Sequence, residues 1–185
     1  MRLILASASP QRRDILTSLG VTFTIRAPGV EEATSGPPLE VARENARRKA
    51  LAAQAAAGEL VLAVDTVVAL GDELWGKPPD AATAHETLRC LSGRTHQVIS
   101  GFAVARGPSI EVGHEITDVT FRTLDEPTVA WYVDQHEWEG RAGAYAIQGR
   151  GALLVERIEG DYLNVVGLPV VALSGVWPLV HGTRT

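Results

Sequence analysis

Cysteine, lysine and surplus positive charge are scarce in this sequence of 185 residues. The single cysteine, Cys90, excludes an intramolecular disulfide and a cysteine-rich zinc site. The formal net charge of −5 argues against a broad electrostatic grip on DNA or RNA. No apolar run reaches the roughly 18–20 residues that span a bilayer, and Leu3–Ala6 is too short for the core of a secretory signal. We therefore expect a cytoplasmic protein without a nucleic-acid or membrane partner.

The sequence has enough apolar material to build a core. Hydrophobic residues make up 45% of it and charged residues 21%, which excludes intrinsic disorder. The length fits one domain, and no linker, repeat or low-complexity segment divides the chain. We therefore expect a single domain over residues 1–185.

Lysine is the rarer basic residue. Of the 17 basic residues only Lys49 and Lys77 are lysines, and the others are arginines. A codon bias toward arginine explains this composition. Equally, each remaining lysine could stand where the chemistry needs a compact ammonium group. Composition alone does not separate these two explanations.

Hydrophobic periodicity and turn residues predict strands and helices in a mixed order. Ser9-Pro10 and Asp80 are typical helix starts, and Gly107-Pro108 favours a turn between two antiparallel strands. The expected helices cover residues 10–19, 39–57, 81–91, 126–136 and 168–180, the last broken near Pro178. The expected strands cover residues 3–6, 21–25, 60–70, 95–106, 111–122 and 152–158. This order indicates an α/β or α+β domain and not a regular βαβ repeat.

Asp65 is the strongest anomaly in the sequence, because it interrupts the apolar run 61–69. A carboxylate in such surroundings is costly to bury unless it is paired, hydrogen-bonded or bound to a metal. Asp65 is therefore a candidate metal ligand or a candidate general base toward water.

Two further segments suit phosphate binding. Ser7–Arg13 follows an expected strand and begins a helix, where free N–H groups and the helix dipole favour an anion. An ordinary capped helix with solvated arginines explains the same segment. Lys77, in a loop rich in glycine and proline, could serve as a phosphate counter-charge or as a solvated loop residue.

Two other segments could contact a metal or a base. Glu31-Glu32 offers hard oxygen ligands for a divalent cation, although a plain acidic loop has the same sequence. The small residues of Gly143–Gly149 let the backbone approach a planar ligand closely. Within that loop, Gln148 has both a donor and an acceptor with which to read a base edge.

These segments together resemble the Maf family of nucleotide pyrophosphatases. The resemblance covers nearly the whole chain and includes eight motifs in order: Ser7–Arg13, Glu31-Glu32, Lys49-Ala50, Ala63–Val68, Gly76–Pro78, Leu91–Val98, Ala142–Gly149 and Asn164–Pro169. Both lysines fall on family motifs. The resemblance implies a Maf/inosine-triphosphatase-like fold, in which an elongated mixed β-sheet flanked by helices carries a nucleotide cleft.

The resemblance also implies a hydrolase of nucleotide metabolism. Such house-cleaning enzymes convert a nucleoside triphosphate to the monophosphate and pyrophosphate with a divalent cation, Mg²⁺ or Mn²⁺, and a homodimer is expected. The loop Tyr145–Gly149 resembles that of the subfamily that prefers dTTP and UTP. Two alternatives stay open: the same reaction on 7-methyl-GTP, and a non-catalytic nucleotide-binding regulator, since the family is linked to septum formation and cell division.

The resemblance assigns expected roles residue by residue. Asp65 activates water and contacts the metal, assisted by Glu32, with Glu31 as a substitute. The triphosphate is held by Ser7, Arg12, Lys49 and Lys77, of which Arg12 and Lys77 also act in catalysis. Substrate selectivity falls to Gln11, Thr66 and Gln148. The chain departs from the family at Gln11, where arginine is usual, and at Arg141, where lysine is common.

Overall fold

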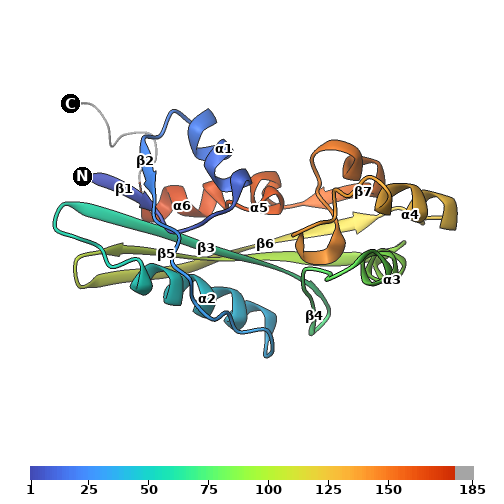
Figure 1. Cartoon of the computed structure of the whole chain (residues 1–185), viewed down its shortest axis with the longest axis horizontal. Helices are drawn as coiled ribbons and strands as arrows, with labels where there is room; N and C mark the ends of the chain where they lie inside the picture. Colours follow the sequence, from blue (N-terminus) through green and yellow to red (C-terminus); the bar gives the residue numbers. More distant parts are fainter. Residues whose placement is uncertain (178–185) are drawn as a thin grey trace.

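A mixed sheet runs along the molecule and carries helices on both faces (Figure 1). The computed structural model describes residues 1–177, within which the sheet has seven strands. The strand order is β2-β1-β3-β5-β6-β7, with β4 beside β3; β1 is parallel to β2 and β3, and the other pairs are antiparallel. The strands are β1 (Arg2–Leu5), β2 (Phe23–Ile25), β3 (Glu59–Leu70), β4 (Glu73–Trp75), β5 (Thr95–Arg106), β6 (Ser109–Phe121) and β7 (Val155–Glu159). The expected mixed α/β class is confirmed.

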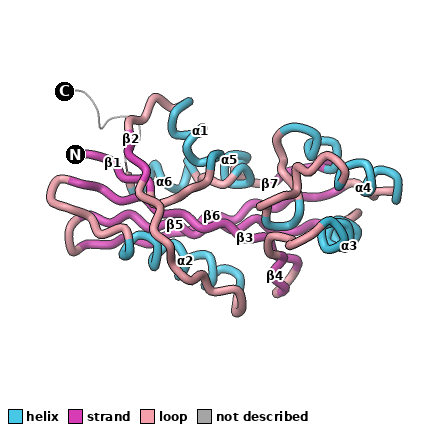
Figure 2. Tube along the Cα trace, viewed as in Figure 1, coloured by secondary structure: helices cyan, strands magenta, loops and turns pink. Residues whose placement is uncertain are grey.

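The helices divide between the two faces and one end of the sheet. They are α1 (Pro10–Ser18), α2 (Pro38–Ala52), α3 (Ala81–Leu91), α4 (Glu126–Val133), α5 (Tyr162–Val166) and α6 (Val170–Val176), with two 3-10 turns at Ala142–Ala144 and Gly149–Leu154. Figure 2 shows α2 on one side of the long strands, α1, α5 and α6 on the other, and α3 and α4 toward one end. None of the helices in residues 1–177 is long and apolar enough to cross a bilayer.

The predicted caps of α1 and α3 are confirmed, but two predicted helix ends are wrong. Ser9 caps α1 and Asp80 caps α3. The helix expected over residues 126–136 already ends at Val133. The helix expected over residues 39–57 also ends early, at Ala52, and Gln54 adopts a left-handed conformation with φ of 49°. The reason is a tertiary contact: the Arg26 guanidinium donates to the carbonyl oxygens of residues 53 and 54, 3.0 and 3.2 Å away. This contact overrides the helix propensity of the following alanines.

The part of the chain that follows α4 differs from the prediction in three places. The strand expected at 152–158 begins at Val155, because Gly149–Leu154 forms a 3-10 turn whose backbone N–H groups bond to the Glu137 carboxylate. The helix α5 was not predicted. The last helix runs from Val170 to Val176 and not from residue 168 to 180. The expected break near Pro178 lies outside the described residues.

A single glycine brings α2 close to the sheet. A Cβ atom at Gly101 of β5 would lie 2.3 Å from the carbonyl carbon of Ala42 of α2, so only glycine permits this approach. Gly101 is also the register partner of Asp65 on β3. The close contact therefore brings α2 next to Asp65, which Asn45 and Lys49 of this helix contact.

β3 has an unpaired edge in its middle. On one side it pairs with β1 as far as Leu62 and with β4 from Val68 onward, so residues 63–67 have a neighbouring strand only in β5 among the described residues. Asp65 and Thr66 lie in this gap. An acid in an apolar strand is tolerated here because the strand borders an opening.

Candidate active site

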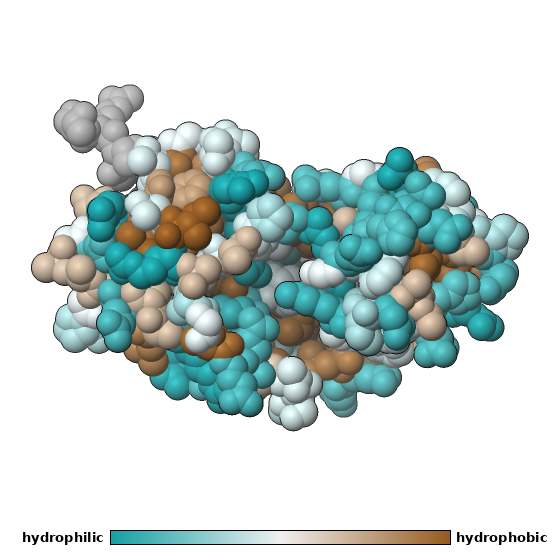
Figure 3. All heavy atoms as spheres, viewed as in Figure 1, coloured by the Kyte–Doolittle hydropathy of each residue, from teal (hydrophilic) through white to brown (hydrophobic). Residues whose placement is uncertain are grey.

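The gap in β3 opens into a cleft of about 1110 Å³, which is large enough for a nucleoside triphosphate. The surface is hollowed between the end that carries α1 and the end that carries α3 and α4 (Figure 3). The structure brings every residue of the predicted site to this cleft: Ser7, Gln11, Arg12, Glu32, Lys49, Asp65, Thr66, Lys77 and Gln148. Glu31, the substitute for Glu32, is not among the lining residues.

On the α2 face of the sheet, one ammonium group links two carboxylates. Lys49 Nζ lies 2.6 Å from Asp65 Oδ1 and 2.7 Å from Glu32 Oε1. Asp65 has only 10% of its side chain exposed, whereas Glu32 has 44% exposed and lies near the solvent. The second oxygen of Asp65 accepts a hydrogen bond from Asn45 Nδ2 at 3.0 Å. Asn45 was not predicted as a site residue, since nothing in the sequence distinguishes it from a surface amide of α2.

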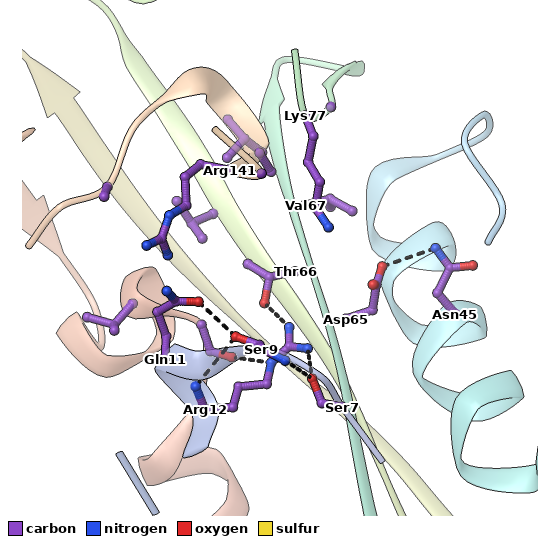
Figure 4. Close-up of a pocket in the computed structure, with 18 of the residues that line it drawn as sticks. Ser7, Ser9, Gln11, Arg12, Asn45, Asp65, Thr66, Val67, Lys77 and Arg141 are labelled. Atoms are coloured by element: carbon purple, nitrogen blue, oxygen red, sulfur yellow. Dashed lines mark hydrogen bonds between the residues drawn. The ribbon is translucent and has the colours of Figure 1, made fainter. Parts of the chain in front are cut away.

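On the opposite face, the buried guanidinium of Arg12 joins three segments (Figure 4). It donates to the carbonyl oxygen of Gly167 at 2.8 Å, to Ser7 Oγ at 2.9 Å and to Thr66 Oγ1 at 3.1 Å. Thr66 Oγ1 is in turn 2.8 Å from Ser100 Oγ on β5. Burial lowers the pKa of Arg12, and the fields of Asp65 and Glu32 oppose that effect. The cleft therefore has carboxylates and an ammonium on one side of β3 and a fixed guanidinium on the other.

Two further positively charged side chains, those of Lys77 and Arg141, line the cleft. Figure 4 shows the side chains of Lys77, in the loop after β4, and Arg141, in the loop before the first 3-10 turn, extending into the cleft, Arg141 toward Gln11. Gln11 itself accepts a hydrogen bond from Ser9 Oγ at 2.9 Å. Arg141 thus belongs to the cleft lining, which its family position alone did not indicate.

Two buried tyrosines anchor the loop that carries Gln148. Tyr145 Oη is 2.9 Å from His96 Nε2, and Tyr132 Oη accepts the backbone N–H of Ala146 at 3.0 Å. Burial raises the pKa of Tyr132 to about 12, so its hydroxyl stays neutral at physiological pH. Gln148 stands exposed at the end of this anchored loop.

The buried His96 is expected to make the free energy of unfolding of the protein depend on pH. It is 1% exposed, and burial lowers its pKa from 6.5 to about 4. The unfolded chain takes up a proton as the pH falls through 6.5, whereas the folded chain resists protonation until about pH 4. The free energy of unfolding should therefore fall by about 3 kcal/mol over this window because of His96.

Denaturant titrations at several pH values test this expectation. In His96→Gln the unfolding free energy should lose this dependence between pH 6.5 and 4, because glutamine does not titrate. The same slope in both proteins would show that His96 is not the group responsible.

The carboxylates of the cleft suit a divalent cation that also binds phosphate. No group of three or more His, Cys, Asp or Glu residues that could hold a metal occurs in residues 1–177. Asp65 and Glu32 both contact Lys49, so their carboxylates lie close together in the cleft. They offer hard oxygen donors to a cation. Mg²⁺ is commonly held by one or two carboxylates together with substrate phosphates. The residues present therefore fit a cation that arrives with a phosphorylated ligand.

Comparison with known proteins identifies the family of this chain. A family model described as Maf-like protein matches residues 2–176. The dTTP/UTP pyrophosphatase of Pyrococcus furiosus is 41% identical over 183 residues, covering 97% of this chain and 96% of that protein. The dTTP/UTP pyrophosphatase of Moorella thermoacetica is 47% identical over 178 residues, covering 94% and 92%.

A solved structure supports the fold independently. The HAM1 protein from Coxiella burnetii superimposes with a TM-score of 0.54 at 18% identity, covering 95% of this chain and 98% of that one. At this identity the likeness concerns the fold alone. With the family model matched along almost all of the described residues, the chain belongs to the Maf family.

Proposed function

We propose that this protein is a hydrolase that converts dTTP and UTP to the nucleoside monophosphate and pyrophosphate. The names of its relatives in Pyrococcus and Moorella support the reaction and the bases. One observation in the structure carries the proposal: Lys49 contacts Asp65 and Glu32 at the cleft, with the Arg12 guanidinium across β3. This arrangement suits a polyanion whose cleavage needs both a base and positive charge.

Asp65 is the proposed general base. As a water oxygen bonds to the α-phosphorus, the Asp65 carboxylate takes the proton, and the bond from the α-phosphorus to the bridging oxygen breaks. Pyrophosphate leaves with that electron pair. Among residues 1–177, each Asp65 oxygen has one protein partner, Lys49 or Asn45. Because a carboxylate offers about four lone-pair sites, it can still accept from water.

Positively charged side chains hold the triphosphate. Lys49, Lys77 and Arg12, with the Ser7 hydroxyl, balance the charge that grows on the leaving pyrophosphate. Within the part of the chain that the structure describes, three of the N–H donors of Arg12 bond to the protein. A guanidinium has five such donors, so two are left for phosphate oxygens.

Glu32 and Asp65 would hold the divalent cation, Mg²⁺ or Mn²⁺. When bound, such a cation neutralises charge on phosphate oxygens as a Lewis acid. Gln11, Thr66 and Gln148 are the proposed selectivity residues, Gln148 from the rim of the cleft. We further propose that residues 1–185 form one cytoplasmic domain that works as a homodimer without nucleic-acid or membrane partners.

A panel of triphosphates tests the proposed function. The purified protein is incubated with dTTP, UTP, CTP, ATP, GTP or 7-methyl-GTP plus Mg²⁺ or Mn²⁺, and pyrophosphate is resolved from orthophosphate. We expect pyrophosphate, fastest with dTTP and UTP. Faster release from 7-methyl-GTP would reassign the base, and thermal stabilisation by nucleotides without turnover would favour the regulator.

Lys77→Ala is expected to reduce turnover of UTP at least about tenfold, because it removes a charge that faces the leaving group. Lys77 is exposed, so the melting temperature should hardly change. Arg106→Ala is the matched control, since Arg106 is an exposed cation outside the cleft. Equal activity of the two variants would remove Lys77 from the catalytic machinery.

A further inference from the structure

Asn45 connects the two acidic elements of the cleft. It lies on α2, one helical turn before Lys49, and is only 2% exposed. Its Nδ2 group donates to Asp65 Oδ2 at 3.0 Å and to the carbonyl oxygen of Ala33 at 3.0 Å. Its Oδ1 accepts the backbone N–H of Ala33 at 2.8 Å. The side-chain amide of Asn45 therefore hydrogen-bonds both to the proposed base and to the residue next to Glu32.

These three bonds fix the amide in one orientation. Both N–H donors and the oxygen of Asn45 are occupied. The side-chain amide accepts from the backbone N–H of Ala33 and donates to its carbonyl oxygen, as a neighbouring β-strand would. Because Glu32 precedes Ala33, this pairing sets where the Glu32 carboxylate enters the cleft. The remaining donor binds Asp65 Oδ2 and leaves Oδ1 to Lys49, one turn further along the same helix.

We propose that Asn45 is a positioning residue that holds Asp65 and the Glu32 loop as one unit. This inference rests on the proposed function, because it assigns Asn45 its effect through the base Asp65. Lys49 alone would leave this unit loose, since an ammonium on a flexible stem sets no direction. Asn45 adds the directional bonds that hold the carboxylate toward the phosphate. Misplacement of a reacting group by about 1 Å can cost a hundredfold in rate.

The test is a double-mutant cycle with Asp65→Asn. In the wild-type background, Asn45→Leu should lower kcat for UTP by about tenfold to a hundredfold and change KM much less, because it disorders the base and not the nucleotide site. In the Asp65→Asn background the same substitution should lower kcat by a much smaller factor, because only the Glu32 loop is then left for Asn45 to position. A purely structural role predicts the same loss in both backgrounds and would overturn the inference.

Asn164 provides the matched control. It is also a fully buried asparagine, and it donates to the Val98 carbonyl and to Thr117 Oγ1 at 3.0 Å, with no contact to Asp65. Any loss of kcat in Asn164→Leu should therefore multiply with that of Asp65→Asn. Non-additivity confined to Asn45 supports the positioning role, and non-additivity at both sites contradicts it.

Two further outcomes are distinguishable. If Asn45→Leu does not fold, Asn45→Asp replaces it, since aspartate keeps the size and the acceptor but loses both donors, and the same cycle applies. If Asp65→Asn is inactive while both Asn45 variants have normal kcat, only the inference fails. If Asp65→Asn itself retains normal kcat, the assigned base and the inference fail together.

Discussion

Asp65→Asn is expected to lower kcat for dTTP and UTP at least about a hundredfold while the protein remains folded. The amide keeps an oxygen that can accept from Lys49, so the packing of α2 on β3 should survive. It cannot take a proton from water, which is the step assigned to the carboxylate. Initial rates at saturating nucleotide, with circular dichroism of the same samples, measure both parts.

Glu31→Gln is the control for this substitution. It makes the same change of charge one residue from Glu32, but Glu31 is exposed and does not line the cleft. Its kcat should stay within about twofold of wild type, as for a surface charge in a solvated loop. Near-normal turnover by Asp65→Asn would refute the assignment of the base.

Arg12→Met is expected to reduce both stability and activity. The guanidinium is 8% exposed and supports Ser7, Thr66 and the Gly167 carbonyl. Its loss leaves buried acceptors without a donor, so the free energy of unfolding should fall by about 2–4 kcal/mol. The loss of a fixed donor to the triphosphate should lower kcat/KM by about a hundredfold or more. Urea titrations and steady-state rates measure the two effects separately.

The neighbouring arginine is the control for Arg12. Arg13 is 51% exposed and pairs with Asp14 at the surface. Arg13→Met should change the unfolding free energy by less than about 1 kcal/mol, as is usual for an exposed ion pair. Equal effects of the two substitutions would show that Arg12 has no special place in the cleft.

The local signals of the sequence predicted much of the fold. Ser9 and Asp80 were expected to cap helices, and their side chains do so. The prediction was wrong where a distant contact decides the structure. Arg26 ends α2 by bonding to carbonyl groups beyond Ala52. No periodicity within residues 39–57 contains that information.

The site residues could be predicted where the local sequence is unusual or matches a family motif. Asp65 stood out by its apolar surroundings, and the family motifs named the other lining residues. Asn45 has neither an unusual local sequence nor a place in one of those motifs. That α2 turns it toward Asp65 depends on Gly101, which lets the helix approach β5. This packing is a property of the folded chain, so only the structure reveals the contact.

Hydrolysis of UTP in water enriched in ¹⁸O shows which phosphorus is attacked, because the labelled oxygen stays bound to that phosphorus. If water attacks the α-phosphorus with Asp65 as its base, mass spectrometry should find ¹⁸O in UMP and unlabelled pyrophosphate. Label in pyrophosphate, or orthophosphate as the released product, would contradict the account.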